Sequence, residues 1–432
     1  MQVHGTKRWV ILVLVSILGG LMVYLPFLKY SYYDQMVLIF TQYKSSVPSE
    51  RVNEFMGNCV SYHSIVAMFG YLITGFLADK FSERNLLTLG GLILGGASFG
   101  LGTVPSETTT ILLYLIMAVG VCLVFTSYIL VLRKLGTAQE QGRMYSVSEF
   151  TRAGIQIIMG FLVVAVLNKA VLPSGETDVM ILGQQWKKAL TMNGILLCAV
   201  SVAVFLLMPK DLKGNEESSE EGESQSITLK SAVAVLKLPG TWLVSLMIFL
   251  AYSFVTCASG YLAPFTVNVL GITQTQASSY AIVRNYFLAA VSTLTIGIVA
   301  DKVGGRSKTL GIYLFFATVL TAVLLATQSH SGLCIAVTFV FAFVYLGMKG
   351  IYFAPMEELG IPLNLSGAAI GVISFFGYMA DTFFPKLAGR WLDRYGNVGY
   401  NYIWYWAIGC GILGMGVTVI ASRYAKKRNT QK

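Results

Sequence analysis

The sequence has few charged residues. Asp, Glu, Lys and Arg make up 12% of its 432 residues, whereas soluble domains average about 25%. Hydrophobic residues account for 55%, and the mean hydropathy is +0.67. This composition excludes an ordinary water-soluble domain and places most of the chain in a lipid bilayer.

The sequence also has few residues of the kinds that build metal or catalytic centres. It contains 3 His and 6 Cys, and the cysteines are scattered without the spacing of a metal site. They are better explained as small packing residues of helices than as disulfide or redox groups. Because we find no Walker loop, nucleophile elbow or catalytic triad pattern, we expect no enzyme activity, no cofactor, no metal and no direct use of ATP.

Twelve apolar runs are long enough to cross a bilayer as helices, since about 20 residues span its hydrocarbon core. We place them near residues 9–30, 56–78, 85–104, 109–132, 147–170, 188–208, 240–264, 277–300, 308–327, 332–354, 367–388 and 402–422. Most of the 31 Lys and Arg fall in loops on the side of the two termini. The positive-inside rule therefore predicts an integral multi-pass protein of the cytoplasmic (inner) membrane, with both termini cytoplasmic and the first span retained.

A hydrophilic segment divides the chain. Residues 210–239 include the acidic stretch GNEESSEEGESQS at 214–226, which is too polar to fold alone. We expect a cytoplasmic linker between an N-terminal six-helix bundle (1–209) and a C-terminal one (240–432). A plain tether is favoured over a regulatory docking site. Although the net charge is +10, the basic residues are dispersed, so no nucleic-acid partner is expected.

One charged motif occurs twice. Residues 75–84 read GFLADKFSER and residues 297–306 read GIVADKVGGR, each at the end of an apolar run. The motif resembles the signature loop G-x-L-a-D-r-x-g-r-k of the major facilitator superfamily, and the second copy sits at the equivalent place after helix eight. The resemblance implies an all-α membrane protein with 12 transmembrane helices in two pseudo-symmetric six-helix bundles, monomeric by default. It says nothing about substrate.

In that superfamily the motif latches the two halves together when the inner gate is shut. The resemblance carries this role to Asp79, facing the start of the eleventh helix, and to Asp301, facing the start of the fifth. Ser82 and Glu83 depart from the pattern, so the first latch is expected to be the weaker one. The predicted latch residues are Gly75, Asp79, Arg84, Gly297, Asp301 and Arg306.

A second similarity relates the halves. Arg133 and Lys134 follow the fourth span in RKLG, and Glu357 and Glu358 follow the tenth in EELG. Opposite charges at matched positions can pair across the inner mouth. Solvated loop ends are the other explanation and the favoured one.

Charged side chains within the spans need a partner or a function, because insertion at mid-membrane costs at least about 2.5–3.5 kcal/mol. The resemblance implies that helices 1, 4, 7 and 10 line a central cavity flanked by 2, 5, 8 and 11, where all these residues fall. Their basic excess predicts a small anionic substrate. The predicted substrate-binding residues are Lys29, Arg152, Arg284, Lys349, Tyr24, Tyr252 and Tyr345.

Structural explanations compete with several of these assignments. Lys29 and Asp34 lie near the outer interface and can simply extend toward it. Glu149 and Arg152 are one helix turn apart and can neutralise each other. About half of the tyrosines can belong to an interfacial aromatic belt. Lys349 has no acid one turn away and is the favoured binding candidate.

Four residues are candidates for proton coupling, namely Asp381, Glu149, Asp34 and His63. Asp381 is a carboxylate inside the eleventh span and can carry a proton unless Lys349 or Lys386 pairs with it. His63 is more simply explained as a packing residue among aromatic and aliphatic neighbours.

These patterns predict a secondary transporter that moves a small organic anion (a sugar acid, carboxylate or phosphate ester) by alternating access. Proton symport or anion antiport would drive it, with H⁺ as the expected coupling ion. A weaker similarity, in the segment YLPFLKYSYYD at residues 24–34, links the chain to bacterial sugar-acid and organic-anion porters. The alternatives are a multidrug or cation efflux carrier of the same superfamily and a membrane sensor that does not transport.

Overall fold

The computed structural model describes residues 5–136, 140–210, 212, 229–303, 305–362 and 365–429. Contacts divide the chain into two compact units, Met1–Glu223 and Ser224–Lys432, here called the N-half and the C-half. The predicted domain limits at 209 and 240 stay a prediction, because most of the segment between them lies outside the described residues. Residues 229–236 of that segment form a helix, so the predicted linker is not irregular throughout.

The N-half is built from helices. The first span is divided into two helices, and each of the next five spans is one long helix. They are α1 (Thr6–Tyr24), α2 (Lys29–Leu38), α3 (Val52–Lys80), α4 (Glu83–Gly102), α5 (Glu107–Leu135), α6 (Gln141–Leu167) and α7 (Val179–Leu207), with the short helical turns η1 (Ile39–Tyr43), η2 (Ser49–Arg51) and η4 (Asn168–Ala170).

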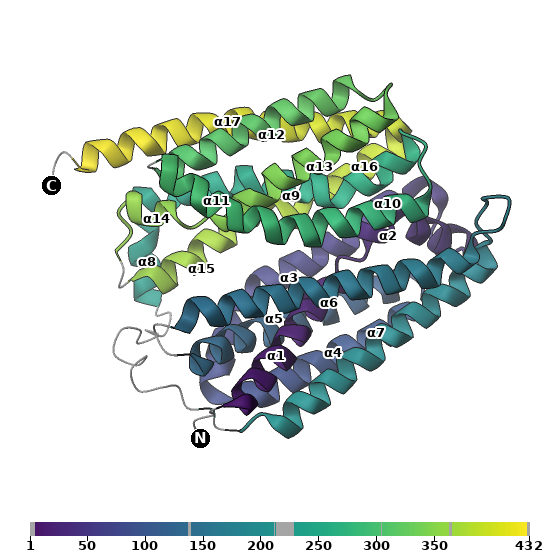
Figure 1. The fold of residues 1–432 in the computed structure, drawn as a ribbon, viewed down its shortest axis with the longest axis horizontal. Coiled ribbons are helices and arrows are strands. Elements are labelled where there is room, and N and C mark those ends of the chain that lie inside the picture. The colour runs from purple at the N-terminus through teal and green to yellow at the C-terminus, as the bar shows by residue number, and fades with distance from the viewer. Residues whose placement is uncertain are drawn as a thin grey trace. The chain divides into compact units, whose positions relative to one another are not determined.

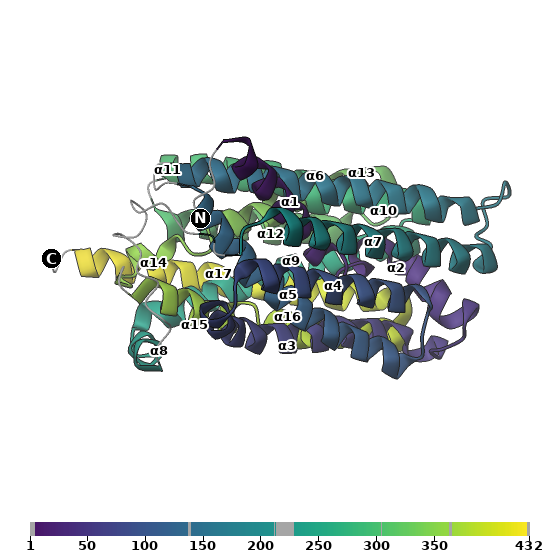
Figure 2. The ribbon, with the colours of Figure 1, turned by 90° about the horizontal axis from the view of Figure 1, so that it is seen from below.

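The C-half is also helical, but two of its spans are interrupted. It contains α8 (Leu229–Leu236), α9 (Pro239–Asn268), α10 (Gln274–Ile282), η6 (Val283–Leu288), α11 (Ala289–Val303), α12 (Arg306–Ala326), α13 (Ser331–Gly347), η7 (Met348–Gly350), α14 (Pro355–Glu358), α15 (Ser366–Gly377), α16 (Ala380–Tyr395), η9 (Gly396–Val398) and α17 (Gly399–Asn429). The short helix α8 packs beside α15 (Figure 2).

The fold class predicted from the sequence is confirmed. Within the described residues there is no β-strand, only one isolated bridge between Val171 and Thr177. In the same part of the chain, 10 helical stretches are long and apolar enough to cross a membrane, the last of them containing α15 to α17. The helices correspond in order to the twelve predicted spans, six in each half.

Small residues allow the helices of the N-half to approach closely. Figure 1 shows α4 beside α7, and a Cβ added at Gly91 would lie 1.9 Å from Ser201 Oγ. A Cβ at Gly95 would lie 2.5 Å from Cys198 Sγ. A Cβ at Gly95 would also lie 3.2 Å from the Gly194 carbonyl oxygen. The two helices therefore approach closely, as small-xxx-small steps allow in membranes.

Three spans are interrupted near charged residues. The first span breaks between α1 and α2, around Pro26, directly before Lys29. The eighth contains a π-helical turn, η6, that carries Arg284. The eleventh breaks between α15 and α16, directly before Asp381. Interrupted helices and π turns in membrane proteins often mark functional sites.

Candidate transport site

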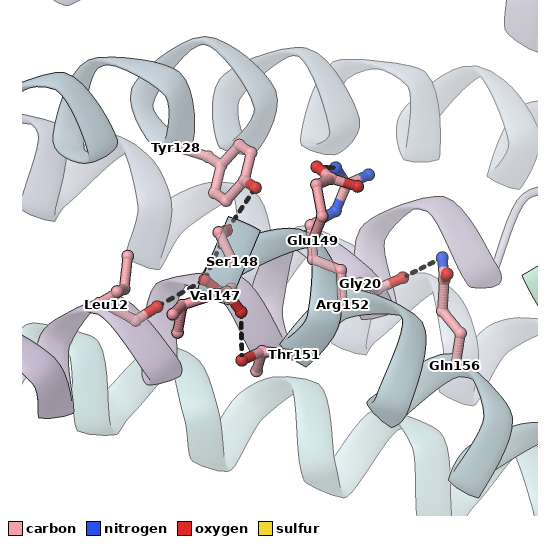
Figure 3. Close-up of polar contacts among 10 residues, drawn as sticks. Leu12, Gly20, Tyr128, Val147, Ser148, Glu149, Thr151, Arg152 and Gln156 are labelled. Atoms are coloured by element: carbon pink, nitrogen blue, oxygen red, sulfur yellow. Dashed lines mark hydrogen bonds and ion pairs between the residues drawn. The ribbon is translucent and has the colours of Figure 1, made fainter. Parts of the chain in front are cut away.

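Three helices of the N-half meet at a buried hydroxyl network. Ser148 of α6 lies 2.6 Å from Tyr128 Oη of α5 and 2.7 Å from Ser16 Oγ of α1 (Figure 3). Ser16 Oγ also lies within hydrogen-bond distance of the Leu12 carbonyl oxygen, at 2.6 Å. These buried hydroxyls hold α1, α5 and α6 together without a charge.

Glu149 and Arg152 form an ion pair on α6, one turn apart (Figure 3). The guanidinium also lies over the ring of Tyr128, 5.4 Å from its centroid. The Arg152 side chain is 19% exposed and that of Glu149 is 62% exposed. The structure thus brings together two residues for which the sequence left pairing and ligand binding open, and a substrate anion would have to compete with Glu149 for Arg152.

Two tyrosines connect the helices on either side of the break in the first span to α6 through hydrogen bonds. Tyr24 Oη lies 2.7 Å from Tyr32 Oη, and Tyr32 donates a hydrogen bond to the carbonyl of Gly160 at 2.8 Å. Lys29, at the start of α2, is 1% exposed, with its ammonium 5.8 Å from the ring centroid of Tyr30. A side chain this buried does not extend to the membrane interface. Asp34 is half-buried on the same helix.

His63 lies in apolar surroundings on α3. Its ring is 5.7 Å from that of Phe27 in an edge-to-face arrangement, and the residue is 3% exposed. Neither ring nitrogen has a hydrogen-bond partner among the described residues. His63 is therefore buried by packing rather than by a polar network.

In the C-half, two hydroxyl groups of α9 bind the carboxylate of Asp381. Tyr252 Oη donates to Oδ2 at 2.6 Å, and Thr256 Oγ1 donates to Oδ1 at 2.6 Å. Asp381 is 5% exposed. Tyr252, predicted to bind substrate, here positions the carboxylate. Thr256 was not singled out in the sequence, although Tyr252 and Thr256 stand four residues apart on one helix face, the spacing that lets two side chains reach one partner.

Aromatic rings surround this carboxylate. The rings of Tyr252 and Tyr378 pack edge to face at 4.7 Å, and the ring of Tyr352 lies 6.5 Å from each of them. Tyr352 is 1% exposed, and its hydroxyl has no hydrogen-bond partner among the described residues. A buried hydroxyl without a partner is unfavourable unless a ligand or water satisfies it.

Arg284 is a buried cation for which the described part of the chain supplies no acidic partner. It is 1% exposed, and its Nη1 donates to Thr338 Oγ1 at 2.9 Å. The guanidinium lies 5.6 Å from the ring centroid of Phe339. Nη2 has no hydrogen-bond partner, and no ion pair of Arg284 occurs within the described ranges. The Tyr345 hydroxyl lies 3.3 Å from Ser259 Oγ.

Lys349 lies beyond the end of the regular helix of its span. Its helix, α13, ends at Gly347, and Lys349 is an exposed residue of the turn η7 that follows. The predicted tenth span continued to residue 354, but the chain leaves the regular helix before Lys349 is reached. The side chain is exposed, unlike that of Arg284.

Comparison with known proteins decides the family. The model of the Major Facilitator Superfamily matches residues 52–385, more than three quarters of the chain. The chain belongs to the major facilitator superfamily. It is therefore a membrane transporter by family and not an enzyme.

Two curated relatives come from Escherichia coli K12. The inner membrane protein YihN is 25% identical over 406 residues, covering 92% of this chain and 91% of its own. The inner membrane protein YqcE is 24% identical over 425 residues, covering 96% of this chain and 94% of its own.

Solved structures share the fold at low identity. A bacterial homologue of the human lysosomal transporter Spinster, inward-facing and unoccupied, has a TM-score of 0.71 at 12% identity, covering 98% of this chain and 97% of its own. A D-xylose–proton symporter has a TM-score of 0.71 at 13% identity, with 94% and 97% covered. The nucleoside transporter NupG has a TM-score of 0.71 at 12% identity, with 96% and 99% covered.

The major facilitator motif is described only in part. The side chains of Gly75, Asp79 and Asp301 lie outside the described residues, so their latch role stays a prediction. Arg84 lies over the ring of Phe205 in α7, 4.6 Å from its centroid, which is a contact within the N-half.

The other motif residues occur in the C-half. Gly297 of α11 faces open space, since an added Cβ would meet nothing within 4 Å. Arg306 begins α12, and its backbone N–H donates to the Glu358 carboxylate.

Two charged residues of the second internal similarity, Lys134 and Glu358, have partners within their own halves. The Lys134 ammonium pairs with Glu83 at the start of α4. Glu358 binds the start of α12, accepting hydrogen bonds from the Ser307 backbone N–H at 3.0 Å and from Ser307 Oγ at 2.8 Å, besides that from Arg306. A carboxylate at a helix N-terminus satisfies unpaired N–H groups and complements the helix dipole.

We expect Glu358→Ala to lower the free energy of unfolding by about 1–2 kcal/mol, the usual cost of losing an N-terminal cap. Glu357→Ala is the matched control, because Glu357 is exposed and adjacent in sequence. The measurement is thermal unfolding of both purified variants in detergent. Equal melting temperatures would show that Glu358 does not stabilise α12.

Proposed function

We propose that this protein is a secondary active transporter of a small organic anion, with Arg284 as the residue that binds the anion. The substrate class is a sugar acid, a carboxylate or a phosphate ester. Transport proceeds by alternating access between the two halves, in the cytoplasmic membrane, with both termini in the cytoplasm and the protein as a monomer. The names of the two Escherichia coli relatives support the inner-membrane location.

The observation that carries the proposal is the environment of Arg284. A guanidinium that is 1% exposed has lost its hydration, and such a charge is normally offset by an acidic partner. Among the described residues, Nη1 donates to one hydroxyl group, and Nη2 has no hydrogen-bond partner. The planar guanidinium matches the geometry of a carboxylate or phosphate and can bind either with two parallel hydrogen bonds. A substrate anion would supply the missing charge.

Asp381 is the proposed proton carrier. Its oxygens meet two hydroxyl groups, from Tyr252 and Thr256, and a hydroxyl can donate to a carboxylate or accept from a carboxylic acid. The same contacts can therefore accommodate both protonation states. A solved structure of similar fold is named as a D-xylose–proton symporter, which makes proton symport a natural mechanism, and anion antiport is the alternative.

Efflux of lipophilic cations is the second candidate function. The tyrosine cluster of Tyr252, Tyr352 and Tyr378 beside Asp381 favours it, because aromatic faces and a carboxylate bind cations. Arg284 in the same half argues against it, since a buried positive charge repels a cation. A sensor that does not transport would bind a ligand and show no flux.

A ligand screen separates these functions. The purified protein in detergent is heated with sugar acids, carboxylates, phosphate esters or lipophilic cations at two pH values, because a ligand of the folded state raises the melting temperature. We expect stabilisation by one class of anion and its loss in Arg284→Gln. Stabilisation by lipophilic cations alone would contradict the proposal and support efflux, and anion binding without flux in proteoliposomes would support the sensor.

A further inference from the structure

A groove runs between α12 and α17 on the C-half, and the two helices lie side by side in Figure 1. Its volume is about 470 Å³. It owes its depth to a close approach of the helices, since a Cβ added at Gly311 would lie 2.6 Å from Thr418 Oγ1. The groove is lined by Lys308, Gly311, Ile312, Phe315, Met415, Thr418, Val419, Ser422, Arg423 and Lys426.

Polar and apolar residues occupy different parts of this groove. Ile312, Phe315, Met415 and Val419 line the part toward the middle of the two helices. Among the basic residues, Lys308 lies near the start of α12, which begins at Arg306. Arg423 and Lys426 lie near the end of α17, which ends at Asn429. One end of the groove is therefore cationic, and the remainder is mainly apolar, with the hydroxyls of Thr418 and Ser422.

The cationic end contains two basic residues that form no ion pair in the described part of the chain, Lys308 and Arg423. Its three basic residues are Lys308, Arg423 and Lys426, and no acidic residue lines the groove within the described ranges. In the same part of the chain, Lys308 and Arg423 take part in no ion pair. Both side chains are exposed. An anion at this end would meet the charges of Lys308 and Arg423, for which the described residues supply no ion pair.

The surface around the groove is apolar and exposed. Phe315 is 50% and Phe316 51% exposed on α12, while Leu413 is 64% and Ile420 57% exposed on α17. In a chain that spans a membrane, apolar side chains on such a face contact lipid. A ligand of this groove therefore has to be accessible from the bilayer and have both an anionic group and a hydrocarbon chain.

We propose that the groove binds an anionic phospholipid, with its phosphate at Lys308, Arg423 and Lys426 and one acyl chain along Ile312, Phe315 and Val419. Basic pockets between transmembrane helices bind anionic headgroups, each Lys or Arg near the surface contributing about 1 kcal/mol. The acyl chain supplies the apolar contact that a soluble phosphate lacks. The site does not depend on Arg284 or on the transported substrate.

Native mass spectrometry of the full-length protein tests the site with defined lipids. The probes are dioleoyl phosphatidylglycerol, dioleoyl phosphatidylcholine and free glycerol phosphate, which separate the negative charge from the acyl chains. We expect the anionic lipid to bind more tightly than the neutral one and glycerol phosphate not to bind detectably. The double variant Lys308→Gln, Arg423→Gln should lose about fivefold in affinity for each charge removed, roughly 25-fold in all.

The matched control for charge is Lys237→Gln, Lys302→Gln, which removes two exposed basic residues of the same half outside the groove. A second pair of variants tests the acyl-chain path. Val419→Trp should block the groove, whereas Ile420→Trp, the next residue on α17 and not part of the lining, should not.

The proposal is overturned if the two lipids bind equally, if the control pair loses as much affinity as the groove pair, or if Val419→Trp and Ile420→Trp behave alike. Binding of glycerol phosphate as strong as that of the lipid would identify a soluble-phosphate site instead. Loss of substrate binding with lipid binding intact would affect only the proposed function.

Discussion

Replacing Arg284 by Gln is expected to reduce uptake of the anion by about 100-fold or more, while folded protein remains in the membrane. Removing one partner of a buried charge pair costs about 3–5 kcal/mol, and each 1.4 kcal/mol is a factor of ten in binding. The guanidinium is 1% exposed, so water cannot replace the lost contact. The measurement is the initial rate of uptake into proteoliposomes.

Three further variants test whether the anion contact is specific to Arg284. Arg284→Lys keeps the charge but not the planar pair of donors, so an intermediate rate is expected. Thr338→Val removes the hydroxyl bound to Nη1 and should have a smaller effect. Lys349→Gln changes an exposed cation. Unchanged uptake in Arg284→Gln would contradict the assignment of the anion site to Arg284.

Replacing Asp381 by Asn is expected to abolish accumulation driven by a proton gradient while leaving exchange of labelled for unlabelled substrate. Asn can still bond to both hydroxyls of Tyr252 and Thr256, which lie 2.6 Å from the carboxylate oxygens, because its amide oxygen accepts from one and its amide nitrogen donates to the other. It cannot release a proton at physiological pH. Substrate binding should therefore be retained, whereas the coupling of substrate transport to proton movement should be lost. The accumulation ratio with and without a pH gradient measures this.

A comparison with His63→Gln distinguishes the candidates for proton coupling. His63 is packed against Phe27, without a hydrogen-bond partner for its nitrogens in the described part of the N-half, so we expect His63→Gln to keep proton-driven accumulation. The coupling role would move from Asp381 to His63 if the two results were reversed. Loss of exchange in Asp381→Asn would indicate that Asp381 binds substrate.

The sequence predicts the helices better than their interruptions. A run of apolar residues identifies a span, because a helix needs about 20 such residues to cross the bilayer. The spans that contain Arg284 and Asp381 could therefore be located. The π turn at Arg284 and the break before Asp381 depend on packing against neighbouring helices, and a single sequence does not record it. For the same reason the sequence did not show that α13 ends before Lys349, which lies in the turn η7 at the end of the tenth span.

The interaction partners of the charged residues were harder to predict than the positions of these residues in the spans. Arg152 and Glu149 are neighbours on one helix face, so local spacing indicated their ion pair. Thr256 and Asp381 are 125 residues apart in sequence, and only the tertiary fold brings them together. The same holds for Glu358, whose hydrogen bonds to Ser307 cross from α14 to α12.

The π-helical turn η6 (Val283–Leu288) also changes how the eighth span should be aligned and drawn. A π turn holds one residue more than an α turn, and each residue of an α-helix turns the chain by about 100°. The faces of α10 and α11 are thus offset by one residue relative to an unbroken helix. A helical wheel drawn through this span would assign lipid-facing and inward-facing positions correctly on one side of Arg284 and wrongly on the other, and an alignment without a gap there would transfer the error to every relative that lacks the extra residue.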